Sequence, residues 1–140
     1  MSEQTTNTSE GKATFVAQVG GDHYQSELQH WDFIEANRLP YIIGCATKYL
    51  QRWREKDGVK DLRKAISYLD KAVALNKAGI LKPQPFGLKV PVADYVAANK
   101  LPAVEAAATQ LIVCWRKASD LEMAKAMIET LITSTGQTGA

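Results

Sequence analysis

Apolar residues recur every three or four positions in six stretches of the chain, and segments containing polar residues, proline or glycine separate these stretches. This spacing places the apolar side chains of each stretch along one face of a helix. In the second stretch, Ile42, Ala46 and Trp53 share such a face. No segment alternates apolar and polar residues for long enough to predict a strand. The pattern predicts an all-α fold, with helices over residues 31–39, 41–56, 59–78, 93–100, 102–117 and 120–133.

Prolines and glycines set the expected boundaries. Pro40 disfavours helix at the residue before it and suits the first turn of a new helix. Gly58 and Gly79 suit the left-handed turns that end helices. We expect a flexible N-terminal tail (1–14), a motif-bearing helical unit (15–79) that begins with an extended arm, a Pro/Gly linker (80–92), a degenerate second helical unit (93–133) and a flexible C-terminal tail (134–140).

An internal repeat relates the two units. A shift of 62 residues places the segment 32–40 over 94–102, and both copies contain asparagine, a basic residue, leucine and proline in succession. The same shift pairs Trp53 with Trp115, which we expect in the core together with Trp31. A one-residue deletion in the second turn then aligns Lys64-Ala65 with Lys125-Ala126. The repeat predicts two units, each a short helix plus a helical hairpin, packed into one compact bundle.

The charge is distributed unevenly. The whole chain carries a net charge of +2, but residues 48–77 contain nine basic and four acidic residues. The repeat matches Lys48, Arg52 and Lys56 with Gln110, Cys114 and Ala118, so the basic residues occur only in the first copy. A local positive block on a mildly acidic remainder indicates an anion site rather than a surface for long nucleic acids.

Two adjacent helices carry the candidate site. Lys48, Arg52 and Lys56 recur every four residues on the first helix, and Lys60, Lys64 and Tyr68 do so on the next, near Asp61. Because a short turn makes these helices antiparallel neighbours, their basic stripes are expected to face each other and to bind phosphate oxygens. The alternative is a solvated helix face with local pairs such as Lys56 with Asp61.

A second candidate lies before the first helix. Gly20 and Gly21 permit a turn whose backbone N–H groups point at an anion, and His23 and Tyr24 follow with a donor and a ring. The alternative is a plain loop. His30 is expected at a helix cap or on the surface.

Several site classes are disfavoured. The sequence contains no phosphate loop, dinucleotide-binding glycine motif, nucleophile elbow or paired-carboxylate cluster, and its two histidines lack partners at zinc-ligand spacing. Cys45 and Cys114 fall in apolar patterns and are expected to be buried free thiols in a reducing cytosol. No apolar stretch is long enough to span a membrane and the N-terminal residues do not form a secretory signal, so we expect a cytoplasmic protein with no membrane partner.

The segments 22–24, 46–56 and 61–69 together resemble a small bacteriophage protein family with the approximate pattern D-H-Y, K-Y-x-x-R, K and D-L-x-K-A-x-x-Y-L. The resemblance covers roughly residues 20–75. Family members are described as uncharacterised or as nucleotide kinases, the latter through similarity to a T7-type phage nucleoside-monophosphate kinase without a phosphate loop. The polar positions that the resemblance implies for ligand binding are His23, Tyr24, Lys48, Tyr49, Arg52, Lys56, Asp61, Lys64 and Tyr68.

Three functional hypotheses follow from the residues and the resemblance together. The first is a phage-encoded protein, acting in the host cytoplasm, that binds a phosphate-bearing nucleotide in a basic cleft lined by tyrosines, with sequestration of a host nucleotide immune signal as one specific form. The second is a kinase-like enzyme that phosphorylates deoxynucleoside monophosphates with ATP and Mg²⁺, with Asp22 or Asp61 near the metal. The third, disfavoured by the modest net charge, is a DNA-binding helical protein. Homo-oligomer formation is compatible with all three.

The first hypothesis also makes a prediction about stability. Arg52→Ala is expected to remove nucleotide binding and to leave the melting temperature nearly unchanged. A large loss of stability would instead mean that the basic stripe is structural.

Overall fold

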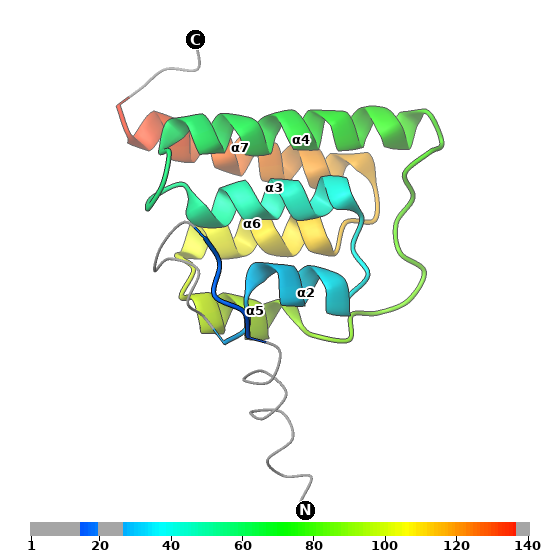
Figure 1. The fold of residues 1–140 in the computed structure, drawn as a ribbon. Coiled ribbons are helices and arrows are strands. Elements are labelled where there is room, and N and C mark those ends of the chain that lie inside the picture. The colour runs from blue at the N-terminus through cyan, green and yellow to red at the C-terminus, as the bar shows by residue number, and fades with distance from the viewer. Residues whose placement is uncertain (1–14, 20–26, 137–140) are drawn as a thin grey trace, which may run out of the picture.

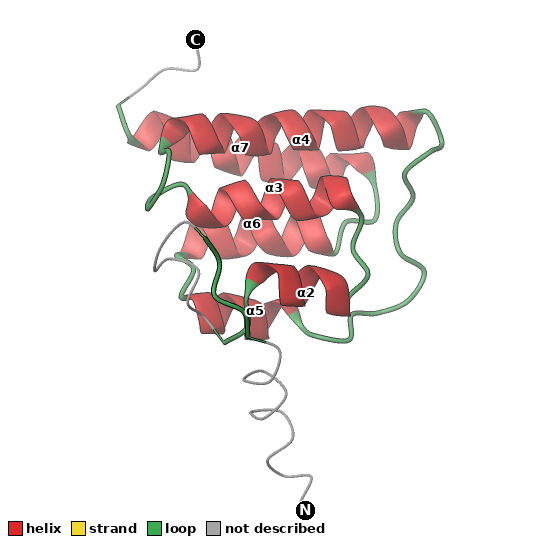
Figure 2. Cartoon of the chain, in the orientation of Figure 1, coloured by secondary structure: helices red, strands yellow, loops and turns green. Residues whose placement is uncertain are grey.

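The computed structural model describes residues 15–19 and 27–136. Within these ranges the chain forms helices joined by loops and contains no strand (Figure 2), which confirms the all-α prediction. The helices are α2 (His30–Ala36), α3 (Tyr41–Arg52), α4 (Val59–Lys77), α5 (Val92–Asn99), α6 (Ala103–Val113) and α7 (Ala118–Ser134). None of these helices is long and apolar enough to cross a membrane.

The helices lie in three layers of two (Figure 1). α2 and α5 form one outer layer, α3 and α6 the middle layer, and α4 and α7 the other outer layer. α3 and α4 form one antiparallel hairpin and α6 and α7 the other; α4 packs against α7, and α3 packs against α6. One continuous apolar core runs through all three layers, from Phe33 and Tyr95 through Leu50 and Ile112 to Leu62.

The repeat is visible as an approximate two-fold relationship between the units α2–α4 and α5–α7. Phe33 and Tyr95 occupy equivalent positions and stack on each other, with ring centroids 4.6 Å apart and planes inclined by 19°. The backbone conformation is repeated too, because Arg38 and Lys100 both have a φ of 53°. This left-handed conformation is uncommon for residues other than glycine, so its recurrence supports the repeat strongly.

Equivalent asparagines tie each unit to the other. Asn37 donates from Nδ2 to the carbonyl oxygen of Val90, at 2.9 Å, and accepts from the Val90 N–H at 2.8 Å. Asn99 donates from Nδ2 to the carbonyl oxygen of Leu28, also at 2.9 Å. Val90 and Leu28 are themselves related by the 62-residue shift, so each asparagine fixes the segment that leads into the opposite unit.

The register predicted for the last helix of each unit is wrong. Asp61 and Asp120 both occupy the third position of their helices and both accept a preceding backbone N–H. The equivalent helices are therefore offset by 59 residues, and a three-residue deletion separates the copies rather than the predicted single one. Burial agrees, because Ala65 matches the buried Ala124, whereas Ala126 is exposed.

Other boundaries and burial predictions need correction. α3 ends at Arg52 rather than near residue 56, because residues 53–58 form a turn closed by the N–H of Gly58, which donates to the carbonyl oxygen of Trp53. Trp53 and Trp115 are buried as predicted. Trp31 is 42% exposed, because it points away from the α2 face that carries Phe33.

The predicted N-terminal arm is joined to the start of α2 through Gln29. The side chain of Gln29 is buried, donates to the carbonyl oxygen of Val16 at 2.6 Å and accepts the Val16 N–H at 3.3 Å. The proposed tail at 1–14 and most of the tail at 134–140 lie outside the described residues. Residues 78–91 connect α4 to α5 without a helix.

Candidate functional site

Three cations from α3 and α4 gather around one tyrosine ring. The Lys48 Nζ lies 5.6 Å from the centroid of the Tyr49 ring, the Arg52 Cζ lies 4.9 Å from it, and the Lys64 Nζ lies 5.1 Å from it. Tyr68 of α4 stacks on the same ring, with centroids 5.8 Å apart and planes inclined by 8°. We call these five residues the Tyr49 cluster. The structure thus brings together five of the nine sequence-predicted site residues.

The two lysines of the cluster are not neutralised by nearby acids. Neither Lys48 nor Lys64 forms an ion pair with any described residue, and both side chains are half-buried. Tyr49 provides cation–π attraction, which stabilises ammonium groups at partly exposed sites by about 0.5–1 kcal/mol. Two ammonium groups beside one ring, with no carboxylate partner among the described residues, give this part of the surface a local positive charge.

Arg52 has acidic partners, unlike the lysines. Its Nε donates to Asp61 Oδ2 at 3.1 Å and its Nη2 to Asp61 Oδ1 at 3.2 Å, while Nη2 also lies 3.3 Å from Asp57 Oδ2. The Asp61 side chain is 0% exposed and also accepts the N–H of Asp57. Arg52 therefore joins the end of α3 to the start of α4 and holds the turn that positions the cluster. The predicted neutrality of Arg52→Ala for stability is revised accordingly.

An aromatic edge continues from the cluster along the two helices. Tyr41 meets Tyr68 edge-on, with ring centroids 6.5 Å apart and planes inclined by 80°. Hydrogen bonding to the Cys45 thiol, and then to Tyr68, raises the pKa of Tyr41 to about 12. Tyr41 is absent from the sequence-predicted site. The signal that could have revealed it is the four-residue spacing of Tyr41, Cys45 and Tyr49, one turn apart on a single helix face.

The second unit builds the same helical hairpin without this chemistry. The 62-residue offset of α3 and α6 and the 59-residue offset of α4 and α7 give the equivalent residues. The counterparts of Tyr41, Lys48, Tyr49, Arg52, Lys64 and Tyr68 are Ala103, Gln110, Leu111, Cys114, Met123 and Met127. The packing of a hairpin in this fold therefore requires neither the cations nor the tyrosines.

Four predicted site residues are not part of the cluster. Asp61 lies beneath Arg52 as its buried partner. Lys56 is exposed on the turn after α3, so the predicted stripe of cations at every fourth residue stops at Arg52. The ion pair between Lys56 and Asp61 in the alternative interpretation is replaced by the pair between Arg52 and Asp61. His23 and Tyr24, like the glycine turn before them, lie outside the described residues.

His30 and the cysteines differ from expectation. His30 is half-buried, its Nε2 lies 2.7 Å from Thr47 Oγ1, and its ring meets Tyr95 edge-on. Desolvation by burial, with repulsion from Lys48, lowers the pKa of His30 to about 3, so this imidazole is neutral at pH 7. Cys45 and Cys114 are free as predicted, but Cys45 is half-buried and Cys114 exposed.

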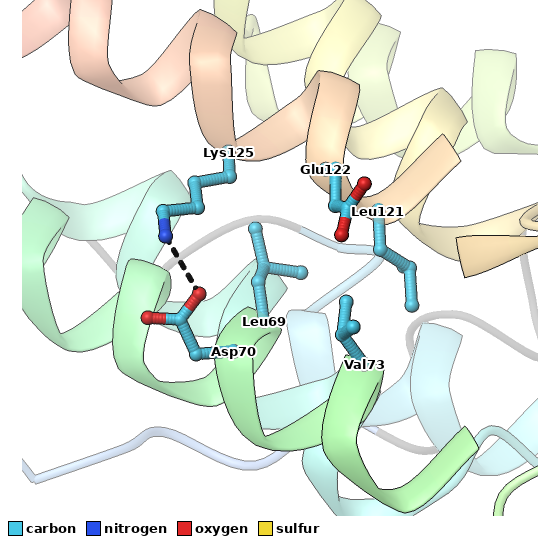
Figure 3. Close-up of a pocket in the computed structure, with 6 residues that line it drawn as sticks. All are labelled: Leu69, Asp70, Val73, Leu121, Glu122 and Lys125. Atoms are coloured by element: carbon cyan, nitrogen blue, oxygen red, sulfur yellow. Dashed lines mark hydrogen bonds and ion pairs between the residues drawn. The ribbon is translucent and has the colours of Figure 1, made fainter. Parts of the chain in front are cut away.

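Two other groups of charged residues have structural roles. The buried Glu105 accepts hydrogen bonds from Trp53 Nε1 and Arg54 Nε, both at 2.8 Å, and so joins the two units. A pocket of about 90 Å³ lies between α4 and α7, where Lys125 donates to Asp70 at 2.8 Å (Figure 3). Ligand pockets typically measure roughly 300–1,000 Å³, so this one is too small for a nucleotide. The described residues contain no group of three potential metal-ligating side chains.

Part of the chain is similar to a known protein family. A family model described as "Protein of unknown function (DUF3310)" matches residues 19–70. That segment includes all nine sequence-predicted site residues as well as Tyr41. No curated protein and no solved structure matches the chain. The match therefore marks the first unit as the part shared with other proteins and assigns no activity to it.

Proposed function

We propose that this protein binds a phosphate-bearing nucleotide at the Tyr49 cluster. The observation that carries the proposal is the convergence of the Lys48 and Lys64 ammonium groups on one ring, without a carboxylate partner among the described residues. Phosphate oxygens form charge-assisted hydrogen bonds with ammonium groups and would relieve the repulsion between the two cations.

The position of the cluster supports a small ligand rather than a long polyanion. The ammonium groups lie at one end of the α3–α4 hairpin, beside tyrosines that suit a base or ribose. Phosphate contacts that bind long nucleic acids extend over many cations, whereas Arg52 and Arg54 of the same basic block are engaged with Asp61 and Glu105. Because Arg52 and Arg54 are paired with carboxylates, fewer cations of the basic block are available to contact DNA phosphates than the DNA-binding alternative assumes.

The kinase-like alternative remains a prediction of the resemblance. Phosphoryl transfer requires carboxylates or equivalent groups that hold Mg²⁺ beside the phosphates. Of the two aspartates considered for this role, Asp61 is engaged by Arg52 and by the Asp57 N–H, and Asp22 lies outside the described residues. The residues of the Tyr49 cluster support binding of a nucleotide. We therefore propose that the protein retains the nucleotide without chemically changing it, because this role requires no residue beyond the cluster.

A screen of melting shifts tests the proposal. Wild-type protein is heated with AMP, GMP, CMP, dTMP, the corresponding triphosphates and cyclic dinucleotides. We expect at least one nucleotide to raise the melting temperature in a concentration-dependent manner, because ligands that bind only the native state stabilise it. Lys48→Gln and Lys64→Met, which introduce the residues of the second unit, should each reduce the shift, whereas Lys77→Gln, at the far end of α4, should retain it.

Two outcomes would decide against the proposal. If no nucleotide changes the melting temperature, the cluster is not a nucleotide site. If the shift is the same in Lys64→Met as in Lys77→Gln, the nucleotide binds elsewhere. Incubation with ATP and dTMP or dGMP, followed by chromatography, tests the kinase alternative, since diphosphate product would show turnover.

A further inference from the structure

We infer that the aromatic edge formed by Tyr41 and Tyr68 is a subsite for a planar base, and that the ligand lies along the α3–α4 seam with its phosphate at Lys48 and Lys64. This inference rests on the proposed function and extends it, because it assigns an orientation to the ligand and a role to Tyr41.

The first argument is the availability of each ring. Tyr49 is stacked by Tyr68 and surrounded by three cations within 6 Å of its centroid, so its faces are already in use. Tyr41 is 77% exposed, and Tyr68 contacts it only edge-on. An aromatic face presented to solvent is available to a stacking partner such as a planar base.

The second argument is that the fold does not need this tyrosine. The equivalent position of the second unit is Ala103, which also begins a helix after a proline N-cap. Cys45, one turn from Tyr41 on α3, and Tyr68, which meets the Tyr41 ring edge-on, correspond to Ala107 and Met127. The second unit thus shows that alanine is sufficient at this position for the hairpin to fold.

The third argument is distance. Tyr41 and Lys48 are seven residues apart on α3, which corresponds to about 10 Å along a helix axis. This separation matches a ligand with a ring at one end and a phosphate at the other, and exceeds what a phosphate ion alone spans. On the antiparallel α4, Lys64 likewise lies nearer than the tyrosine to the turn that joins the two helices, with Tyr68 one helical turn, about 6 Å, farther along the axis.

The test compares ligands with and without a base. Affinities of wild type, Tyr41→Ala, Tyr41→Phe and Lys64→Met are measured by calorimetry for AMP, GMP, CMP and dTMP, and for ribose 5-phosphate, which lacks a base. We expect Tyr41→Ala to weaken binding of the nucleotides about tenfold, because the base loses the aromatic ring on which it stacks. Its affinity for ribose 5-phosphate should stay within twofold of wild type. Tyr41→Phe should bind like wild type, and Lys64→Met should weaken both ligand types.

Failure of this inference differs from failure of the proposed function. If Tyr41→Ala binds nucleotides as tightly as wild type while Lys64→Met does not, the base lies elsewhere and the phosphate site stands. If Tyr41→Ala weakens ribose 5-phosphate as much as the nucleotides, Tyr41 shapes the phosphate site and the base subsite is overturned. If wild type binds no nucleotide, both proposals are rejected. Equal melting temperatures of wild type and Tyr41→Ala without ligand establish that the variant is folded.

Discussion

The guanidinium of Arg52 engages both carboxylate oxygens of Asp61, through Nε at 3.1 Å and Nη2 at 3.2 Å. The Asp61 side chain is fully buried and that of Arg52 is 13% exposed. Removing one partner of a buried pair leaves an uncompensated charge, which costs several kcal/mol. The pair therefore stabilises the connection between α3 and α4 as well as placing Arg52 against Tyr49.

This relationship predicts a specific stability difference. Arg52→Ala should lower the free energy of unfolding by roughly 2–3 kcal/mol, because Asp61 loses its cation and stays buried. Asp57→Ala, which removes only the more exposed partner, should cost less than about 1 kcal/mol. Urea denaturation of the two variants measures both values. A cost for Arg52→Ala below about 0.5 kcal/mol, as for a surface pair, would show that the pair is not structural.

His30 predicts a dependence of stability on pH. Its pKa is lowered to about 3 in the folded protein, against 6.5 as the ordinary value, so the unfolded chain binds a proton more readily at mildly acidic pH. The contribution of the neutral His30 side chain to the free energy of unfolding is complete above about pH 6.5 and is lost progressively as the pH falls toward 3. Between pH 7 and pH 4 the loss should be on the order of 3 kcal/mol.

His30→Gln isolates this effect from the titration of the carboxylates. Glutamine retains a donor for Thr47 but cannot be protonated in this range. Denaturation midpoints from pH 4 to pH 7 should therefore vary less in the variant than in wild type. Parallel pH profiles would mean that His30 titrates normally in the folded protein.

The paired asparagines predict unequal costs on truncation. Asn37 is buried and satisfies both the N–H and the carbonyl oxygen of Val90, so Asn37→Ala leaves two backbone groups without their partner. We expect a loss of about 2–3 kcal/mol. Asn99 is half-buried, and its side chain bonds one backbone group outside α5, the carbonyl oxygen of Leu28, besides the Tyr95 carbonyl oxygen and the Gln51 side chain. Because fewer inter-unit backbone groups lose their partner, Asn99→Ala should cost less. Chemical denaturation of both variants tests the order, and a larger cost for Asn99→Ala would contradict it.

The left-handed residues predict a gain in stability. Arg38 and Lys100 both have a φ of 53°, a conformation that glycine adopts without steric cost. Each residue is exposed, so replacement removes little packing. Arg38→Gly and Lys100→Gly should each stabilise the fold by about 0.5 kcal/mol, because the relieved strain exceeds the added entropy of the unfolded chain. A melting temperature below that of wild type in both variants would show that these side chains contribute more than their backbone strain costs.

The sequence was sufficient to predict the helices and the repeat, because apolar spacing and the two Asn-basic-Leu-Pro breaks are local signals. It was insufficient for the end of α3, where Arg54, Glu55 and Lys56 are good helix formers. Contacts that the local sequence does not reveal, such as those of Arg52 with Asp61 and of Arg54 with Glu105, favour a turn there. The predicted register between α4 and α7 was wrong for a similar reason. The turn before α4 has six residues and the turn before α7 is shorter, and no distinctive sequence pattern reveals this difference.

The candidate site was predicted in part. The spacing of Lys48, Arg52, Lys64 and Tyr68 located the cluster on two helices, but it could not distinguish the ion-paired Arg52 from the two lysines. Tyr41 was missed because the sequence does not show that its side chain is exposed beside Tyr68. Its exposure becomes meaningful only when Ala103 is recognised as its structural counterpart.

The central claim is that the Tyr49 cluster binds the phosphate of a nucleotide, and calorimetric titration tests it most directly. The nucleotide that gives the largest melting shift is titrated into wild type and into two double variants, all shown to be folded. The double variant Lys48→Gln/Lys64→Met carries the residues of the second unit at the cluster, and Lys77→Gln/Lys89→Gln removes the same charge at exposed positions outside it. Removing each charge-assisted hydrogen bond to the phosphate should cost roughly 1.5–3 kcal/mol. The cluster variant should therefore bind at least about 100-fold more weakly than wild type, while the control should bind within about threefold of it. Equal affinities of the two double variants would show that the Tyr49 cluster does not hold the phosphate.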